Sequence, residues 1–159
     1  MILGIDPGLS GGLAIVDGAV LHAAEPMPVT TSAINDKKQI VDGQGLAELV
    51  ASWQLFFGVT DCCIERVGAR PNQGVTSMFN FGLSYGITIG VVTALGMDIR
   101  YVTPQRWKKD LELDGLKDSS RYMAHALWPD FDDKFRRKKD DGIAEAALIG
   151  LWHDSHASE

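Results

Sequence analysis

The first third of the chain contains short, mostly apolar stretches, and residues typical of turns separate them. The stretches lie at residues 1–6, 13–17 and 19–24. Short apolar runs bounded by turn residues predict strands, and the pairs Pro7-Gly8 and Asp17-Gly18 predict tight turns between them. We therefore expect three antiparallel strands at the N-terminus, followed by an irregular polar loop over residues 26–45.

The remainder of the chain combines helical spacing with short apolar runs. Helices are predicted at residues 46–57, 75–95, 105–111, 119–127 and 141–152, and strands at 60–67 and 98–102. The segments 68–74 and 131–139 follow neither pattern and are expected to be irregular. This order predicts one α/β domain over residues 1–152, with a five-stranded mixed sheet flanked by helices and a frayed tail at 153–159.

The segment 71–97 carries no charged residue. Its many Asn, Gln, Ser and Thr residues favour a helix buried in a soluble domain over a membrane span, which needs about 20 predominantly apolar residues. Gly82, Gly86, Gly90 and Ala94 recur every four residues and line one face of this helix. Because each glycine costs about 1 kcal/mol relative to alanine, the stripe predicts close packing, either on the sheet or across a dimer.

Composition and cysteine usage narrow the class of protein. Hydrophobic residues make up 45% of the 159 residues, enough for a sizeable core. The only cysteines, Cys62 and Cys63, are neighbours in a predicted strand and point to opposite faces, so a disulfide scaffold is excluded. The N-terminus lacks the pattern of a signal peptide. We expect a protein of the reducing cytosol.

The net charge of -6 argues weakly against a nucleic-acid-binding protein, but the basic residues are clustered. Each cluster alone is typical of a solvated surface. Together, beside acidic catalytic residues, they are compatible with a basic binding face. The clusters are Arg66 with Arg70, then Arg106, Lys108 and Lys109, and finally Lys134, Arg136, Arg137, Lys138 and Lys139.

Five carboxylates occupy positions that suggest chemistry. Asp6 and Glu65 each follow a strand core, whereas Asp140 and Asp141 open the last predicted helix and Glu145 lies one turn further on. Residues four apart on a helix are only about 40° apart around its axis, so Asp141 and Glu145 can face one point. An acidic residue at the start of a helix is also a common cap, so each of these positions alone is weak evidence for a functional site. If the two strands are adjacent, their carboxylates converge at one end of the sheet.

Converging carboxylates require a positive partner, because a buried anion is costly. Oxygen ligands suit Mg²⁺, with Mn²⁺ as a substitute, and not the softer metals. Two Mg²⁺ ions about 4 Å apart would activate a water and stabilise the leaving oxygen in an attack on phosphorus. The pattern therefore predicts metal-assisted phosphodiester cleavage.

Three motifs, GIDPGLSGGLAIVD, IER and KKDDGIAEAALIG, resemble the RuvC family of Holliday-junction resolvases in its phage-type branch, over roughly residues 1–152. The first motif also opens actin-like ATPases, but the three together in a short chain are specific. The resemblance implies an RNase H-like fold and a Mg²⁺-dependent endonuclease of DNA recombination and repair. It also implies a homodimer that makes paired, symmetric nicks across a four-way DNA junction.

The resemblance also implies residue roles. Asp6, Glu65, Asp141 and Glu145 match the metal-binding catalytic acids, with Asp140 as the alternate on the last helix. The motif TPQRWKK supplies a basic residue near the site, Lys108 or Lys109, with Lys109 taken as catalytic. The stripe Gly82, Gly86 and Gly90 matches a dimer-interface helix. The expected DNA contacts are Arg66, Arg70, Arg106, Lys108, Lys117, Arg136, Arg137 and Lys138.

Two departures from the family pattern leave details open. The spacing from Asp141 to Glu145 is one residue longer than in many relatives, so the ligand set among Asp140, Asp141 and Glu145 is undecided. Gly68 stands where bacterial members carry an aromatic residue that wedges into the junction, and Arg70 is the candidate to replace it.

Other functions compete with this interpretation. An RNase H-like nuclease could act on other branched DNA or on RNA, and a junction-binding protein need not be catalytic. An actin-like sugar kinase needs a second lobe, for which 159 residues leave little room.

Overall fold

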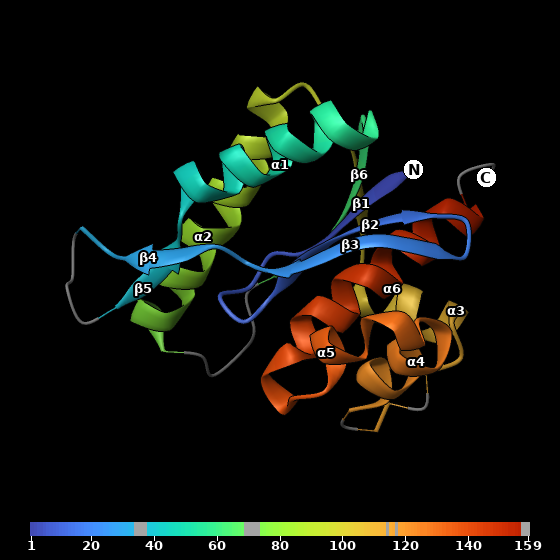
Figure 1. Ribbon diagram of the computed structural model, residues 1–159. Coiled ribbons are helices and arrows are strands. Elements are labelled where there is room, and N and C mark those ends of the chain that lie inside the picture. The colour runs from blue at the N-terminus through green and yellow to red at the C-terminus, as the bar shows by residue number, and fades with distance from the viewer. Residues whose placement is uncertain (34–37, 69–73, 114, 117, 157–159) are drawn as a thin grey trace.

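The computed structural model describes residues 1–33, 38–68, 74–113, 115–116 and 118–156. Its centre is a five-stranded mixed sheet in the order β3-β2-β1-β6-β7 (Figure 1). The strands are β1 (Ile2–Asp6), β2 (Gly12–Asp17), β3 (Val20–Pro26), β6 (Asp61–Glu65) and β7 (Asp98–Val102). The first three are antiparallel, and β6 and β7 run parallel to β1. The predicted five-stranded mixed α/β sheet is confirmed.

Helices cover both faces of this sheet. On one face lie α1 (Gly43–Phe57) and α2 (Val75–Ala94), and on the other lie α3 (Pro104–Asp110), α4 (Ser119–Leu127), α5 (Asp132–Phe135) and α6 (Asp141–His156) (Figure 1). Each face has its own buried cluster of apolar side chains. Cys62 belongs to one cluster and Cys63 to the other, and both thiols are free, as their adjacent strand positions predicted.

Helix α6 crosses β1 so closely that only glycine fits at the crossing. A Cβ atom on Gly4 would lie 2.0 Å from the carbonyl oxygen of Ala146 and 2.6 Å from the amide nitrogen of Gly150. Both contacts are to backbone, which cannot move aside like the end of a side chain. This crossing places the start of α6 beside the ends of β1 and β6.

We expect Gly4→Ala to lower the free energy of unfolding by about 3 kcal/mol, because the methyl group overpacks a rigid crossing. Urea denaturation measures this loss. Gly74→Ala is the control, since a Cβ there meets nothing within 4 Å in the part of the chain that the structure describes, and its effect should stay within about 1 kcal/mol. Equal stability of the Gly4 variant and the wild type would contradict the close crossing.

Three sequence predictions need correction. The loop expected at 26–45 contains a small antiparallel hairpin, β4 (Val29–Thr31) and β5 (Gln39–Val41), which lies beside α2 in Figure 1. The segment 131–139 holds α5 between two 3-10 turns, η1 (Pro129–Phe131) and η2 (Lys138–Asp140). Helix α6 continues to His156, so residues 153–156 are not frayed, and 157–159 lie outside the described residues.

The expectation that the long uncharged helix is buried is wrong. Only Ser84, Thr88 and Val92 of α2 are buried. Their narrow face points into the protein, while the remainder of α2 is half-buried or exposed. By length and composition α2 is also the one helix in the described part of the chain that could cross a membrane, which is weak support for a span.

Candidate active site

Asp6 and Glu65 lie at the same end of the sheet because their strands are adjacent and parallel. Ile5 of β1 is the register partner of Ile64 of β6, so the next residue on each strand is a carboxylate. The condition set by the sequence, that the two strands be neighbours, is met. The start of α6 is held at this end by a bridge between Gly11 and Gly142, which brings the helix acids to the strand acids.

Asp6 is the carboxylate most strongly perturbed by this arrangement. Burial, followed by the nearby charges of Glu65 and Glu145, raises its pKa from 3.8 to about 8. The amide of Gly8, in the turn after β1, donates a hydrogen bond of 3.4 Å to Asp6 Oδ1 and partly opposes the rise. Like charges crowded at a buried site favour a proton or a cation between them.

Helix α3 delivers two side chains to this cluster. Trp107 is fully buried and its indole Nε1–H donates a 2.9 Å hydrogen bond to Glu65 Oε1. The adjacent Lys108 reaches Glu145, with its Nζ 2.5 Å from Oε1. Burial lowers the pKa of Lys108, but the hydrogen bond and charge of Glu145 outweigh it, so the pKa is raised and the lysine is protonated. Lys108, and not Lys109, is therefore the basic residue at the carboxylates, whereas Lys109 is exposed.

Helix α4 supplies a residue that the sequence did not indicate. Ser120 is buried and its Oγ donates a 3.1 Å hydrogen bond to Glu145 Oε1. Trp107 was also missed as a site residue. Neither side chain ionises at ordinary pH, so neither belonged to the predicted set of charged residues. Only the packing of α3 and α4 on α6 brings them to the carboxylates. The position of Trp107 next to Lys108 was the one sequence signal that could have indicated it.

Asp141 belongs to the carboxylate cluster. Burial, followed by the charge of Glu145, raises its pKa, while Lys108 and Arg121 oppose the rise. Its Oδ1 is buried and has no hydrogen-bond partner among the described residues. A buried carboxylate oxygen without a donor is unusual and is suited to a cation.

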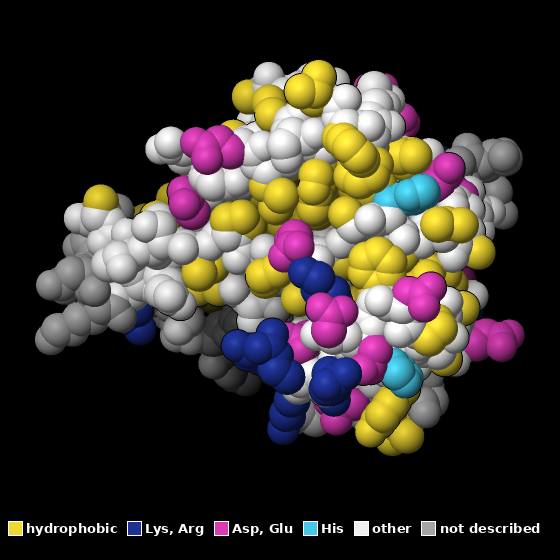
Figure 2. All heavy atoms as spheres, in the orientation of Figure 1, with side chains coloured by type: hydrophobic (Ala, Val, Ile, Leu, Met, Phe, Trp, Pro, Cys, Tyr) yellow, Lys and Arg dark blue, Asp and Glu magenta, His cyan; other side chains and the backbone are white. Residues whose placement is uncertain are grey.

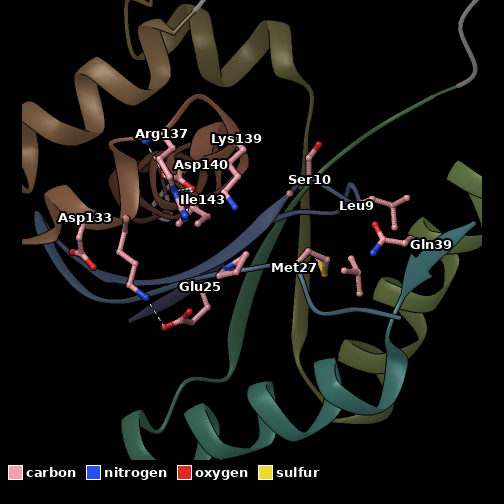
Figure 3. Close-up of a pocket in the computed structure, with 14 residues that line it drawn as sticks. Leu9, Ser10, Glu25, Met27, Gln39, Asp133, Arg137, Lys139, Asp140 and Ile143 are labelled. Carbon is pink, nitrogen blue, oxygen red and sulfur yellow. Dashed lines mark hydrogen bonds and ion pairs between the residues drawn. The ribbon is translucent and has the colours of Figure 1, made fainter. Parts of the chain in front are cut away.

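Asp140 faces away from the cluster, although it is the adjacent residue. Its carboxylate is 2% exposed and accepts hydrogen bonds from the backbone N–H, Nε and Nη2 of Arg137 at 2.8–3.2 Å. Burial raises the pKa of Asp140, but the bonds from Arg137 outweigh it and the pKa is lowered. Asp140 and Arg137 line a separate pocket of about 620 Å³ with Lys139 and Glu25 (Figure 3). The structure therefore groups Asp141, and not Asp140, with Glu145.

The four carboxylates offer the oxygen ligands that a divalent cation prefers. Their side chains do not yet surround a single point. No three His, Cys, Asp or Glu side chains within the described residues are already placed to hold one ion. Glu145 is held by Lys108 and Glu65 by Trp107. Two observations favour a cation: the unpartnered Asp141 oxygen, and the burial and neighbouring carboxylates that raise the pKa of Asp6 to about 8.

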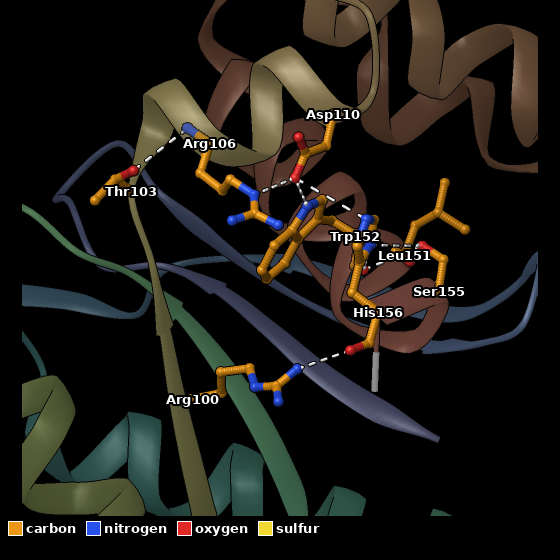
Figure 4. A network of polar contacts seen from close by, with 8 residues as sticks. All are labelled: Arg100, Thr103, Arg106, Asp110, Leu151, Trp152, Ser155 and His156. Carbon is orange, nitrogen blue, oxygen red and sulfur yellow. Dashed lines mark hydrogen bonds and ion pairs between the residues drawn. The ribbon is translucent and has the colours of Figure 1, made fainter. Parts of the chain in front are cut away.

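The remaining basic residues lie around the site rather than in it. Arg106 is exposed and pairs with Asp110 at 2.6 Å, and Asp110 also accepts from Trp152, which fastens α3 to α6 (Figure 4). Arg136 is exposed and pairs with Asp132. Lys and Arg side chains gather near α5 in Figure 2, interspersed with acids. Arg66 and Lys138 are exposed as well, whereas Arg70 and Lys117 lie outside the described residues.

Comparison with known proteins gives one sequence relative and several structural ones. The chain is 36% identical over 84 residues to "Holliday junction resolvase MOC1, chloroplastic" of Chlamydomonas reinhardtii, covering 52% of this chain and 10% of that protein. No protein-family model matches. The matched region is about a tenth of the length of the Chlamydomonas protein.

Three solved structures share the arrangement of elements. RuvC of Thermus thermophilus has a TM-score of 0.64 at 17% identity, covering 99% of this chain and 96% of that one. The same protein in complex with a Holliday junction substrate has a TM-score of 0.65 at 18% identity, covering 98% and 94%. The yeast mitochondrial Holliday junction resolvase Ydc2 has a TM-score of 0.51 at 14% identity, covering 98% and 78%.

Proposed function

We propose that this chain, which has the fold of RuvC, is a structure-selective DNA endonuclease that resolves four-way junctions by metal-dependent phosphodiester hydrolysis. The observation that carries the proposal is the meeting of Asp6, Glu65, Asp141 and Glu145 at one sheet end, beside the protonated Lys108. The 84-residue likeness to a named Holliday junction resolvase supports the substrate.

The four carboxylates are the residues that would hold the metal, as Mg²⁺ or Mn²⁺, with two ions per site. Bound there, the metal would supply an activated water and stabilise the oxygen that leaves phosphorus. Asp6 and Asp141 are the two carboxylates whose pKa is raised, so their ionised forms have most to gain from a bound cation. Lys108 now neutralises Glu145 at 2.5 Å, and in the complex with DNA its charge would offset that of the flanking phosphates. Trp107 and Ser120 orient Glu65 and Glu145 by hydrogen bonds.

Substrate choice tests the proposal against a nuclease for other branched DNA or for RNA. Four-way junctions, flaps, forks, linear duplex and RNA hairpins are compared at equal salt, because salt alone changes binding to phosphates strongly. We expect cleavage of the four-way junction at least tenfold faster than that of any other substrate. Equal or faster cleavage of a flap or an RNA hairpin would favour the alternative nuclease, and junction binding without cleavage would favour a non-catalytic role.

The exposed stripe on α2 supports a homodimer. Gly82, Gly86 and Gly90 are exposed, and a Cβ on any of them would meet nothing within 4 Å among the described residues of its own chain. Packing on the chain's own sheet, which was one of the two interpretations of the stripe, is therefore excluded. A second copy of α2 can approach closely along these glycines, and two active sites would then act on one junction.

We expect Gly86→Leu to convert a dimer into a monomer of 17.3 kDa, because the new side chain fits its own chain but blocks close approach of a partner. Light scattering at micromolar concentration measures the mass. Ser52→Leu on the exposed part of α1 is the matched control and should stay dimeric. A wild-type protein that is monomeric, or that sediments with lipid vesicles instead of dimerising, would contradict this use of α2.

A further inference from the structure

A second pocket, which we call the α2 pocket, lies between the β1–β2 turn, the β4–β5 hairpin and α2 and has a volume of about 670 Å³. Gly8 forms part of its wall, and the amide of the same residue donates to Asp6 Oδ1 at 3.4 Å. The α2 pocket therefore adjoins the candidate active site. Its volume is typical of sites for small organic groups, which measure about 300–1,000 Å³.

The hairpin wall and the helix wall of the α2 pocket are fastened to each other. The hairpin contributes Gln39 of β5, and α2 contributes Asn80 and Phe81. The backbone N–H of Val41, also in β5, donates a 3.5 Å hydrogen bond to the buried Ser84 Oγ of α2. This bond holds the two walls at a fixed separation, so the pocket is built into the fold.

The face of α2 that lines the pocket differs from the face that carries the glycine stripe. Ser77, Asn80 and Ser84 line the pocket and recur at spacings of three and four residues, so they share one face of the helix. Gly82 and Gly86 lie on the opposite side of the helix axis. A dimer contact along the glycines and a ligand in the α2 pocket therefore use different faces.

The lining of the α2 pocket favours an uncharged, planar and polar group. Gln39 and Asn80 carry amides that both donate and accept, and in the part of the chain that the structure describes neither side-chain amide is engaged in a hydrogen bond. Phe81 supplies an aromatic ring, and Lys38 is the one charged side chain among the described residues of the lining. Bases held outside a duplex are bound in this way, by stacking on aromatic rings and hydrogen bonds to their edges.

The pocket on the other side of the β1–β2 turn has a different charge. It shares Leu9, Ser10 and Gln39 with the α2 pocket, and Gln39 lies beside Leu9 in Figure 3. Besides acids, its lining includes three basic side chains, Lys134, Arg137 and Lys139. A basic pocket next to an uncharged polar one suits the alternating phosphates and bases of a single strand.

We propose that the α2 pocket holds one nucleobase of the strand to be cleaved, next to the scissile phosphate, and that Gln39 and Asn80 make cleavage depend on the identity of that base. This inference rests on the proposed function, because it concerns the same substrate. An amide side chain bonds adenine at both N6 and N7, so adenine is the base expected. Stacking on Phe81 does not discriminate, because every base has a π-face.

Cleavage of immobile four-way junctions tests this assignment, with each of the four bases placed in turn at every position that flanks the cleavage site. At one position we expect adenine to give cleavage about tenfold faster than the other bases, which is the effect of one two-bond contact. Asn80→Ala and Gln39→Ala should each lose most of that preference, whereas Phe81→Ala should slow cleavage for all four bases. Gln44→Ala is the matched control, because Gln44 carries an exposed amide on α1 and lines neither pocket. Its base preference should equal that of the wild type.

Equal cleavage rates for the four bases at every position would overturn the inference and leave the proposed function standing. A preference that persists unchanged in Asn80→Ala and Gln39→Ala would also overturn it, because the base would then be read elsewhere. Purine, which lacks the 6-amino group of adenine, tests the contact without any change to the protein, and cleavage as fast as with adenine would contradict the assignment. A wild-type protein that cleaves no junction contradicts the proposed function, and the inference falls with it.

Discussion

Replacement of Asp6 by asparagine is expected to reduce junction cleavage by about 10³-fold or more while junction binding is retained. Asp6 lies among the other carboxylates, and its burial makes it the ligand with most to gain from a cation. The exposed basic residues, and not Asp6, would hold the DNA. Single-turnover cleavage of a labelled junction in Mg²⁺, with a gel-shift measurement of binding, separates the two effects. Undiminished nicking by Asp6→Asn would contradict the metal assignment.

The same variant is expected to make the metal-free protein more stable. The pKa of Asp6 is about 8 in the folded protein against 3.8 ordinarily, so between these values the folded state holds a proton that the unfolded state releases. The free energy of unfolding of the wild type therefore falls as pH rises from about 4 to 8. Asparagine cannot ionise, and Asp6→Asn should be more stable by about 5 kcal/mol at pH 8, with the difference vanishing near pH 4. Denaturation in EDTA across this range measures the slope, and parallel pH profiles would contradict the burial of an anion.

Asp141→Asn and Asp140→Asn should have opposite consequences, although the residues are neighbours. Asp141 lies with Glu145 and has an unpartnered buried oxygen, so its amide variant should lose about 10²-fold or more in cleavage. Asp140 is bound to Arg137, so its variant should cleave within about threefold of the wild type. It should instead lose about 1–3 kcal/mol of stability, because buried hydrogen bonds to a charged group are broken.

Each of these two variants is the control for the other, since both remove one negative charge at the start of α6. Cleavage rate and urea denaturation are measured on both proteins. Loss of cleavage in Asp140→Asn with normal cleavage in Asp141→Asn would reverse the assignment made from the structure.

The core strands and the positions of the long helices were predictable from the sequence, whereas the exposure of α2 was not, because its apolar composition does not match its burial. The core strands β1 and β6 are short apolar runs that end in an acid. The β4–β5 hairpin was missed because each strand has only three residues and five of the six are exposed or half-buried, which leaves no apolar period. Helix α5 was missed because four residues, three of them charged, carry no helical period.

The candidate site was predictable as a set of acids but not in its final membership. Asp140 and Asp141 are equivalent in a sequence pattern, and the pairing of Asp140 with Arg137 becomes visible only once η2 is folded. Lys108 and Lys109 are likewise equivalent in the sequence. Only the folded helix α3 shows that Lys108 faces the carboxylates and that Lys109 is exposed. The α2 stripe predicted close packing, but its open surroundings had to be seen before a contact with its own sheet could be excluded.

The central claim, that these carboxylates form the centre of a junction-resolving nuclease, is tested most directly by mapping cleavage of a four-way junction strand by strand. Each strand is labelled in turn, and the products are compared in Mg²⁺ and in EDTA. We predict paired nicks, symmetric across the junction in strands of like polarity, that require Mg²⁺. Nicks that persist in EDTA, or single unpaired nicks at the rate found on linear duplex, would contradict the account.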